Sequence, residues 1–322
     1  MNITFQCPKH KSRLFFEEQP ERFVCQDGCV YPIRDHIPRF VSSNNYAKAF
    51  GAQWKNYQKT QLDSYTGKSI SHDRLERLVG GDLSIVNGKL ILEAGCGAGR
   101  FTEVLLQAGA RVIAADLSDA VEANYDNCQY YKFYKIIQAD LLDLPIASES
   151  FDMVICIGVI QHTPNPEETI KNLCQFVKPG GLLVIDHYST NYPFTKSRKI
   201  LRSFLIKMPP SFSIRFCRIL VSILWPLHRL LWKYHNHSLI NKLRNWFLKL
   251  SPVVDYHDAY FQLGPELLRA WAMLDTHDTL TDYYKHLRSA EELTETLTQA
   301  GMIDIKTIYA GNGVEARAWK PV

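Results

Sequence analysis

The chain has 322 residues, of which 46% are hydrophobic and 22% charged, and its formal net charge is +4. This composition is typical of an ordinary globular protein and excludes a disordered or low-complexity chain. The length suits one large domain with a smaller one. Residues 1–20 contain no apolar segment typical of a secretory signal, and the eight cysteines show no pairing pattern. We therefore expect a cytoplasmic protein in a reducing compartment.

Residues 1–42 carry a candidate metal site. Cys7 with His10 and Cys25 with Cys29 form two close pairs of potential ligands, separated by fourteen residues. Such pairs suit a tetrahedral structural zinc ion, which would stabilise a segment too small to bury much core. The segment also resembles small zinc-ribbon proteins that activate RNA and protein methyltransferases. The alternative is three free cysteines and a histidine without metal.

The most informative segment is residues 90–101, with the sequence LILEAGCGAGRF. An apolar run ends at Glu93, and glycines follow at positions 95, 97 and 99 before amphipathic sequence resumes. This pattern predicts a buried strand, a tight turn and the start of a helix. Glycine in the turn lets a ligand lie directly on the main chain. A second apolar run ends at Asp116, where an acid can bind two ribose hydroxyls.

Strands and helices alternate from residue 89 onward. Apolar runs predict strands near 89–94, 111–116, 135–139, 152–158 and 181–187, and helices near 99–108, 118–127 and 166–177. This alternation predicts an α/β fold with a mostly parallel, Rossmann-like sheet. Near the C-terminus, Ser289 and Glu292 form a capping box for a helix that ends at Ala300. Residues 311–313, Gly-Asn-Gly, then predict an antiparallel hairpin.

Four motifs in this region together resemble class I S-adenosylmethionine-dependent methyltransferases, and the core is similar to those of ubiquinone and menaquinone biosynthesis. The motifs are the E-x-G-x-G-x-G turn that starts at Glu93 and the segments 138–145, 151–166 and 177–188. A dinucleotide-binding turn would need a third glycine where Arg100 stands. The final antiparallel hairpin also fits this family better than a dehydrogenase, whose strands are parallel. The alternative is an α/β domain that merely contains glycine turns.

The resemblance implies a binding site for S-adenosylmethionine. The implied cofactor-binding residues are Gln61, Glu93, Gly95, Gly97, Asp116, Leu117, Asp140, Leu141 and Ile157. In this family the glycines pass beneath the methionine part, and Asp116 binds the ribose. Asp140 accepts from the adenine amino group, although a cap at the end of a strand is the alternative role for it. The leader, residues 43–88, resembles a segment that folds over the pocket, with its motif at 50–67 and a helix over 71–78.

His162 and His187 are the candidate catalytic residues. His162 follows the predicted strand at 152–158, and His187 ends the predicted strand at 181–187. Both positions lie at the edge of a parallel sheet where ligands bind. A histidine there could remove a proton from a hydroxyl acceptor. The alternatives are that His162 shapes its loop and that His187 packs beneath the following segment. The sequence after the fourth strand lacks the N-P-P-[YF] signature of amino-group methyltransferases, which favours an oxygen or carbon acceptor.

Residues 191–250 contain twelve Lys and Arg and no Asp or Glu, among many large apolar residues. This pattern predicts basic amphipathic helices, with Arg215, Arg218, Arg229, Lys233, Lys242 and Arg244 among their basic residues. Such helices lie in an anionic membrane interface. A helical lid with solvated basic faces is an equal alternative, and a nucleic-acid groove is favoured less because of the Leu and Ile content. The segment is an insertion that divides the predicted core into 89–190 and 251–322.

Three functions remain open at this point. The preferred one is a methyltransferase that acts on an oxygen or carbon of a small or lipid-linked biosynthetic intermediate. It would be cytoplasmic and bind peripherally at the inner face of the membrane. The alternatives are an RNA methyltransferase with an N-terminal zinc module and a non-enzymatic protein that binds S-adenosylmethionine. Salt-dependent RNA binding would distinguish the RNA enzyme.

Overall fold

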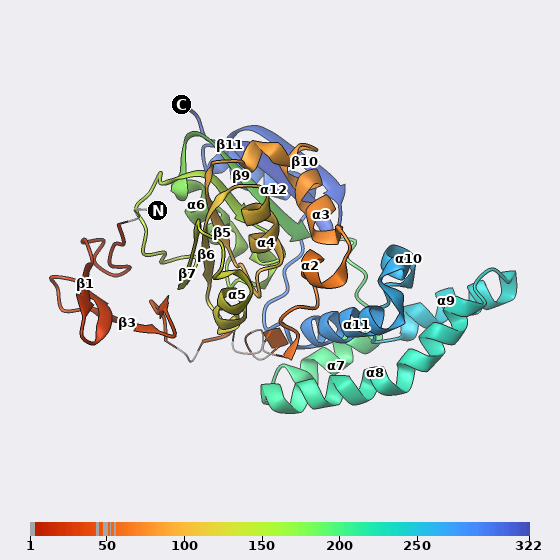
Figure 1. Cartoon of the computed structure of the whole chain (residues 1–322). Coiled ribbons are helices and arrows are strands. Elements are labelled where there is room, and N and C mark those ends of the chain that lie inside the picture. Colours follow the sequence, from red (N-terminus) through yellow and green to blue (C-terminus); the bar gives the residue numbers. More distant parts are fainter. Residues whose placement is uncertain (1–3, 43–44, 48–50, 52, 55) are drawn as a thin grey trace.

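The computed structural model describes residues 1–322 except 1–3, 43–44, 48–50, 52 and 55. Residues 50, 52 and 55 of the predicted leader motif therefore lie outside the described residues. The described chain forms a central sheet between layers of helices, a small N-terminal sheet beside it, and a helical unit that projects from one end (Figure 1).

The central sheet has seven strands in the order β10-β11-β9-β8-β5-β6-β7. In chain order they are β5 (Leu90–Ala94), β6 (Arg111–Asp116), β7 (Tyr134–Gln138), β8 (Phe151–Cys156), β9 (Val177–Tyr188), β10 (Ile303–Ala310) and β11 (Gly313–Trp319). Neighbouring strands are parallel except at β11, which runs antiparallel to both β9 and β10. The predicted α/β fold, a parallel sheet with a C-terminal antiparallel hairpin, is confirmed.

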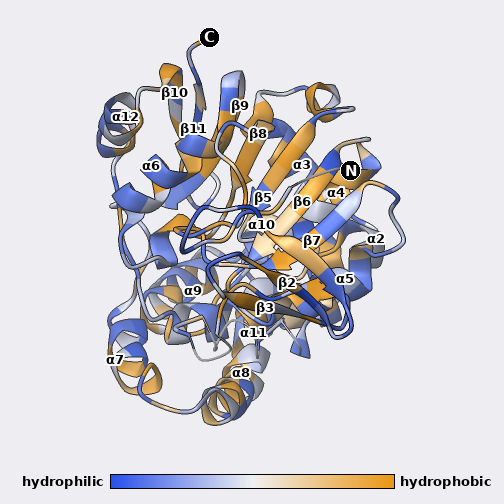
Figure 2. Cartoon of the chain, turned by 90° about the vertical axis from the view of Figure 1, so that its left-hand side faces the viewer, coloured by the Kyte–Doolittle hydropathy of each residue, from blue (hydrophilic) through white to orange (hydrophobic). Residues whose placement is uncertain are grey.

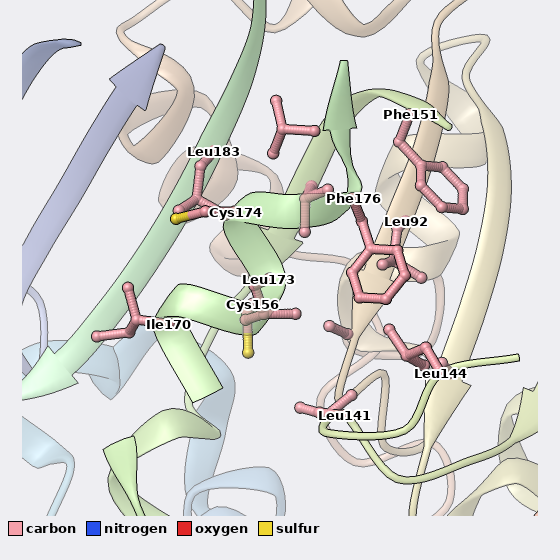
Figure 3. Close-up of a cluster of buried hydrophobic side chains, with 14 of the residues drawn as sticks. Leu92, Leu141, Leu144, Phe151, Cys156, Ile170, Leu173, Cys174, Phe176 and Leu183 are labelled. Carbon is pink, nitrogen blue, oxygen red and sulfur yellow. The ribbon is translucent and has the colours of Figure 1, made fainter. Parts of the chain in front are cut away.

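Helices cover both faces of this sheet. One layer contains α3 (Ile70–Val79), α4 (Arg100–Gln107) and α5 (Ala120–Cys128), and the other contains α6 (Pro166–Phe176) and α12 (Ala290–Gln299). The inner strands are buried on both faces, which is why they read as continuous apolar runs. Figure 3 shows part of the second layer, where Ile170 and Leu173 of α6 gather with Leu92 and Leu183 of the strands.

The ends of the helices follow local sequence signals. Ser289 and Glu292 make both hydrogen bonds of the predicted capping box of α12. Asn165 caps α6 by accepting a hydrogen bond from the main-chain N–H of Glu168 at 3.2 Å. Each such cap stabilises its helix by about 1 kcal/mol. The leader contains two more short elements, α2 (Asp63–Thr66) and η1 (Leu83–Val86).

The N-terminal segment forms its own antiparallel sheet, in the order β1-β2-β3-β4. Its strands are β1 (Phe15–Glu18), β2 (Glu21–Val24), β3 (Val30–Arg34) and β4 (Ile37–Pro38). The chain then joins the edge of the central sheet, because Phe40 N–H donates to the Gln138 carbonyl at 2.8 Å. The Arg39 guanidinium also donates to the Gln138 side chain at 3.0 Å. Figure 2 shows this small sheet in front of the β7 edge.

The helical unit follows β9 and consists of α7 (Lys196–Leu205), α8 (Pro210–Lys233), α9 (Ser238–Leu250), α10 (His257–Tyr260), η3 (Phe261–Leu263) and α11 (Gly264–Thr281). It has its own core, in which Val221 and Trp225 of α8 pack with Leu268 and Trp271 of α11. Among the helices of the described residues, none has the length and apolar character needed to cross a membrane.

This arrangement differs from the predicted division at residue 250. The helix α11 packs against α7 and α8 and not against the sheet core, so the helical unit continues to Thr281. The predicted boundary at residue 250 is the point where acidic residues reappear in the sequence, and the helical unit continues past it. Acids after residue 250 pair with basic residues before it. Arg202 bonds Asp282 at 2.7 Å, and Arg244 bonds Asp258 at 2.8 Å.

Candidate active site

A cavity of about 590 Å³ lies at the carboxyl ends of β5, β6 and β8, between the sheet and the helical unit. Its walls come from the loops that follow these strands, from the leader and from one face of α11. Ligands bind at this edge of open α/β sheets because the loops after the parallel strands converge there. The volume is that of a site for one or two small molecules.

The loop after β5 presents bare main chain to this cavity. Gly95 and Gly97 have positive φ angles of 79° and 50°, which favour glycine. A Cβ atom at Gly95 would come within 2.3 Å of Val159, and one at Gly97 would lie 3.4 Å from the Trp54 indole. Glycine at these positions therefore lets the loop pack closely against Val159 and Trp54, and all four residues line the cavity.

Asp116 lies at the end of β6 and lines the cavity beside this loop. One of its carboxylate oxygens accepts from Gly97 N–H at 2.9 Å. The other accepts from the main-chain N–H and the hydroxyl of Ser118 at 2.8 and 2.7 Å. These hydrogen bonds hold the carboxylate in one orientation. Its oxygens still have lone pairs that can accept hydrogen bonds from a ligand. Burial raises the pKa of this group, so bonds from a ligand would favour its ionised form.

Seven of the nine predicted cofactor-binding residues line the cavity: Gln61, Gly95, Gly97, Asp116, Leu117, Leu141 and Ile157. Glu93 and Asp140 do not. Glu93 is buried beneath the glycine loop, where it accepts a hydrogen bond from the Thr102 hydroxyl at 2.5 Å, and burial raises its pKa to about 8. Asp140 accepts from Leu142 N–H at 3.0 Å, a local bond of the kind expected for a cap at the end of a strand.

Three arginines that the sequence prediction missed as site residues also line the cavity: Arg74, Arg100 and Arg198. Arg74 of α3 forms an ion pair with Asp186 at 2.5 Å. Arg100 donates to Ser71 at 3.0 Å and lies over the ring of Trp271 at 5.2 Å. One terminal nitrogen of Arg100 is buried without a hydrogen-bond partner among the described residues, and burial lowers the pKa of the guanidinium to about 10. An anionic group of a ligand would satisfy this nitrogen.

The two candidate catalytic histidines occupy different environments. His162 lines the cavity, and its Nδ1 lies 3.1 Å from the Tyr284 carbonyl and 3.4 Å from Asp282. Burial lowers the pKa of His162, so its ring is neutral at pH 7. His187 is absent from the cavity walls and contacts the carbonyl of the next residue at 2.9 Å. Burial lowers the pKa of His187 to about 4, which makes it a weak base.

The wall opposite the glycine loop is aromatic and acidic. Helix α11 contributes one face with helical spacing: Trp271, Leu274, Asp275, Asp278 and Thr279. Tyr188, Tyr192, Tyr256 and Tyr260 complete this wall. Burial raises the pKa of Asp275 to about 7 and that of Asp278 to about 6. No local pattern in the sequence predicted this wall.

The four predicted metal ligands come together at the other side of the molecule. The Sγ atoms of Cys7, Cys25 and Cys29 lie 3.8, 3.5 and 3.7 Å from Nδ1 of His10. All four donor atoms lie within 4.8 Å of one another. Bond lengths of about 2.3 Å to sulfur and 2.1 Å to nitrogen place tetrahedral zinc ligands about 3.6 Å apart. The donor set and its spacing therefore fit zinc.

Residues 92–185 match the protein family described as "Methyltransferase domain". The chain is 32% identical over 110 residues to a ubiquinone biosynthesis O-methyltransferase of Coxiella burnetii, which covers 33% of this chain and 47% of that protein. It is 31% identical over 129 residues to the enzyme of the same name from Pseudomonas entomophila, with 38% and 54% covered. The chain thus spans about half the length of these curated relatives.

Among solved structures, the CurJ carbon methyltransferase superposes with a TM-score of 0.47 and 16% identity. The superposition covers 87% of this chain and 62% of that one. The matched family segment contains β5 to β8 and most of β9, together with the glycine loop and Asp116. The zinc-ligand cluster, the leader and the helical unit lie outside it.

Proposed function

We propose that this chain, which contains a class I methyltransferase domain, transfers a methyl group from S-adenosylmethionine to an oxygen or carbon of a small or lipid-linked biosynthetic intermediate. The observation that carries this proposal is the cavity in which the glycine loop meets Asp116 at the carboxyl edge of the sheet. The O-methyltransferase names of the relatives support an oxygen acceptor.

The residues of this cavity fit the cofactor. The main chain at Gly95 and Gly97, which lines the cavity, would lie under its methionine part. Asp116 would accept from the ribose hydroxyls, and Leu117 and Leu141 would enclose the adenine. The unsatisfied nitrogen of Arg100 would bind the methionine carboxylate.

We place the methyl acceptor between His162 and the α11 wall. The bound cofactor supplies an electrophilic methyl group, and the protein aligns the acceptor with it and excludes water. His162 would accept the proton of the acceptor hydroxyl, since its neutral ring is held from behind by the Tyr284 carbonyl and Asp282. His187 has no part in this mechanism because the cavity does not reach it.

Radiolabelled methyl transfer tests this proposal. Protein incubated with methyl-labelled S-adenosylmethionine and an organic extract of its source cells should yield a labelled product. His162→Gln should reduce the rate about 100-fold or more, as loss of a general base does. Because the pKa of His162 lies below its usual value, the wild-type rate should be constant above pH 7 and fall below pH 6. His72→Gln, at a partly exposed position of α3 that does not line the cavity, is the matched control. A rate that is unchanged in His162→Gln would remove this histidine from the mechanism.

We further propose that Cys7, His10, Cys25 and Cys29 bind one structural zinc ion. Zinc would hold the loop before β1 to the turn between β2 and β3. The Tyr31 hydroxyl lies 3.1 Å from the Cys7 sulfur, which orients this ligand as outer groups commonly do. Ligation requires reduced thiols, which supports a cytoplasmic location.

The helical unit supports peripheral binding to an anionic membrane. Of the twelve basic residues in 191–250, Arg198, Arg202 and Arg244 are held by main-chain or acidic groups of the protein, and Arg218 bonds the Tyr57 hydroxyl. Arg244 is therefore not part of the basic surface that the sequence predicted. Nine are exposed: Lys196, Lys199, Lys207, Arg215, Arg218, Arg229, Lys233, Lys242 and Lys249. This excess of positive charge has no acid in the same segment to balance it.

Apolar side chains follow the exposed faces of the same helices. On α8 they are Phe212, Ile219, Ile223, Leu227 and Leu230, and on α9 they are Leu239, Leu243, Trp246 and Leu250. Each is at least 40% exposed. Their spacing of three, four or seven residues places them in stripes beside the exposed basic residues. Hydrophobic stripes flanked by Lys and Arg are suited to the interface of an anionic bilayer.

Charge reversal should abolish this binding. The variant with Arg215, Arg218 and Arg229 all changed to Glu should no longer co-sediment with vesicles that contain phosphatidylglycerol, because each Lys or Arg contributes about 1 kcal/mol at such a surface. Reversing Lys89, Lys132 and Lys135, which are exposed on the methyltransferase core, should leave binding intact. Both variants should still bind S-adenosylhomocysteine. If the wild-type protein does not bind these vesicles at low salt, or binds RNA instead, the membrane role is excluded.

A further inference from the structure

The acceptor half of the cavity contains a carboxylate with unused hydrogen-bonding capacity. Four carboxylates line the cavity: Asp116, Asp255, Asp275 and Asp278. Protein donors bind Asp116, as described above, and Asp255 accepts from His228 at 2.6 Å and from Arg244 at 3.2 Å. Asp275 accepts from the Tyr256 hydroxyl. Asp278 has no side-chain hydrogen bond to any residue that the structure describes.

Asp278 is partly buried, and a partly buried carboxylate without protein donors is unfavourable because its oxygens lose part of their hydrogen bonding to water. A carboxylate accepts hydrogen bonds and cannot donate them while ionised. A ligand beside Asp278 is therefore favoured if it brings a donor and disfavoured if it brings a second negative charge. Burial raises the pKa of Asp278, and the positive charge of Lys285 partly offsets this rise. No hydrogen bond joins the two side chains, since the ammonium lies 2.7 Å from Asp282 and about 5 Å from the ring centres of Tyr188 and Tyr192.

The surroundings of Asp278 are suited to a ring. Tyr188 and Tyr192 stack with ring centres 4.2 Å apart, and the Tyr192 hydroxyl lies 3.2 Å from Thr279, the next residue on α11. Across the wall, Tyr260 packs on Trp271 with ring centres 5.0 Å apart. Flat aromatic surfaces bind other rings by stacking or edge contacts.

We infer that Asp278 binds a hydroxyl group of the methyl acceptor, and that the acceptor is an uncharged, ring-bearing alcohol or phenol. This inference rests on the proposed methyltransferase function and specifies its substrate class. Asp278 thereby selects against carboxylate-bearing acceptors by repulsion, as charged pocket residues commonly do. His162 keeps the separate role of receiving the proton.

Two commercial probes of similar size distinguish these chemistries. The uncharged phenol 4-hexylresorcinol and the anion 4-hexylbenzoate are titrated by calorimetry into protein saturated with S-adenosylhomocysteine. Wild-type protein should bind the phenol and exclude the benzoate. Asp278→Asn should bind the phenol about tenfold more weakly, since it loses a hydrogen bond to a charged group. The same variant should begin to bind the benzoate, because the repulsive charge is gone.

A purely structural role would not invert this selectivity. Glu266→Gln removes one charge from the exposed start of the same helix and is the matched control, expected to behave as wild type. Selectivity that is unchanged in Asp278→Asn, or wild-type preference for the benzoate, would overturn the inference. Wild-type protein that binds S-adenosylhomocysteine but neither probe would overturn the acceptor class alone. Failure to bind S-adenosylhomocysteine would instead refute the proposed function.

Discussion

Asp116→Ala should remove most of the stabilisation that S-adenosylhomocysteine gives the wild-type protein. A ligand at one hundred times its Kd stabilises a protein by about 2.7 kcal/mol, which raises Tm by about 5 °C or more. Two hydrogen bonds from ribose hydroxyls to a carboxylate contribute about 1.5–3 kcal/mol each. Their loss should weaken binding at least a hundredfold, as measured by calorimetry and by the shift in Tm.

The control for this experiment is Asp126→Ala, which removes an exposed carboxylate from α5 in the same layer of the fold. It should keep the full response to S-adenosylhomocysteine. NADH should stabilise neither protein, because Arg100 replaces the third glycine of a dinucleotide turn. Stabilisation by NADH and not by S-adenosylhomocysteine would contradict the assigned cofactor.

Cys25→Ser should release the proposed zinc ion and unfold the N-terminal sheet. Binding of structural zinc in small modules is worth about 10–16 kcal/mol, more than so small a core supplies by itself. Elemental analysis should find one zinc per wild-type chain and almost none in the variant. Hydrogen exchange should accelerate in strands β1 to β4.

Cys174→Ser makes the same substitution at a buried cysteine of α6, outside the cluster, and should keep the metal. The Cys25→Ser variant should still bind S-adenosylhomocysteine, because the cavity contains no residue of the N-terminal sheet. A wild-type N-terminal sheet that is ordered without any metal would refute the zinc assignment.

Local patterns in the sequence were sufficient for the central sheet. The apolar runs that end near Glu93 and Asp116 predicted β5 and β6 to within one residue at each end. The glycines after β5 predicted the bare loop, and the capping box at Ser289 predicted the start of α12. These features depend on residues within one turn or one strand, where side-chain burial and backbone preference act directly.

Tertiary structure alone decided whether the candidate His187 or its neighbour faces the cavity. His187 and Tyr188 are neighbours at the end of β9, but only Tyr188 lines the cavity. Successive side chains of a strand point to opposite faces of the sheet, and the sequence does not say which face the ligand occupies. His162, in the loop after β8, has no such alternation and turns toward the cavity.

Tertiary structure also decided the acceptor wall and the extent of the helical unit. Asp275 and Asp278 lie about 180 residues from the glycine loop, so no spacing rule connects them, and acids on a helix ordinarily face water. The packing of α11 against α8 turns them inward instead. The sequence by itself therefore determined the central sheet, the glycine loop and the closeness of the zinc ligands within each pair, Cys7 with His10 and Cys25 with Cys29. Long-range packing determined which charged residues became buried, because burial depends on contacts between segments far apart in the chain.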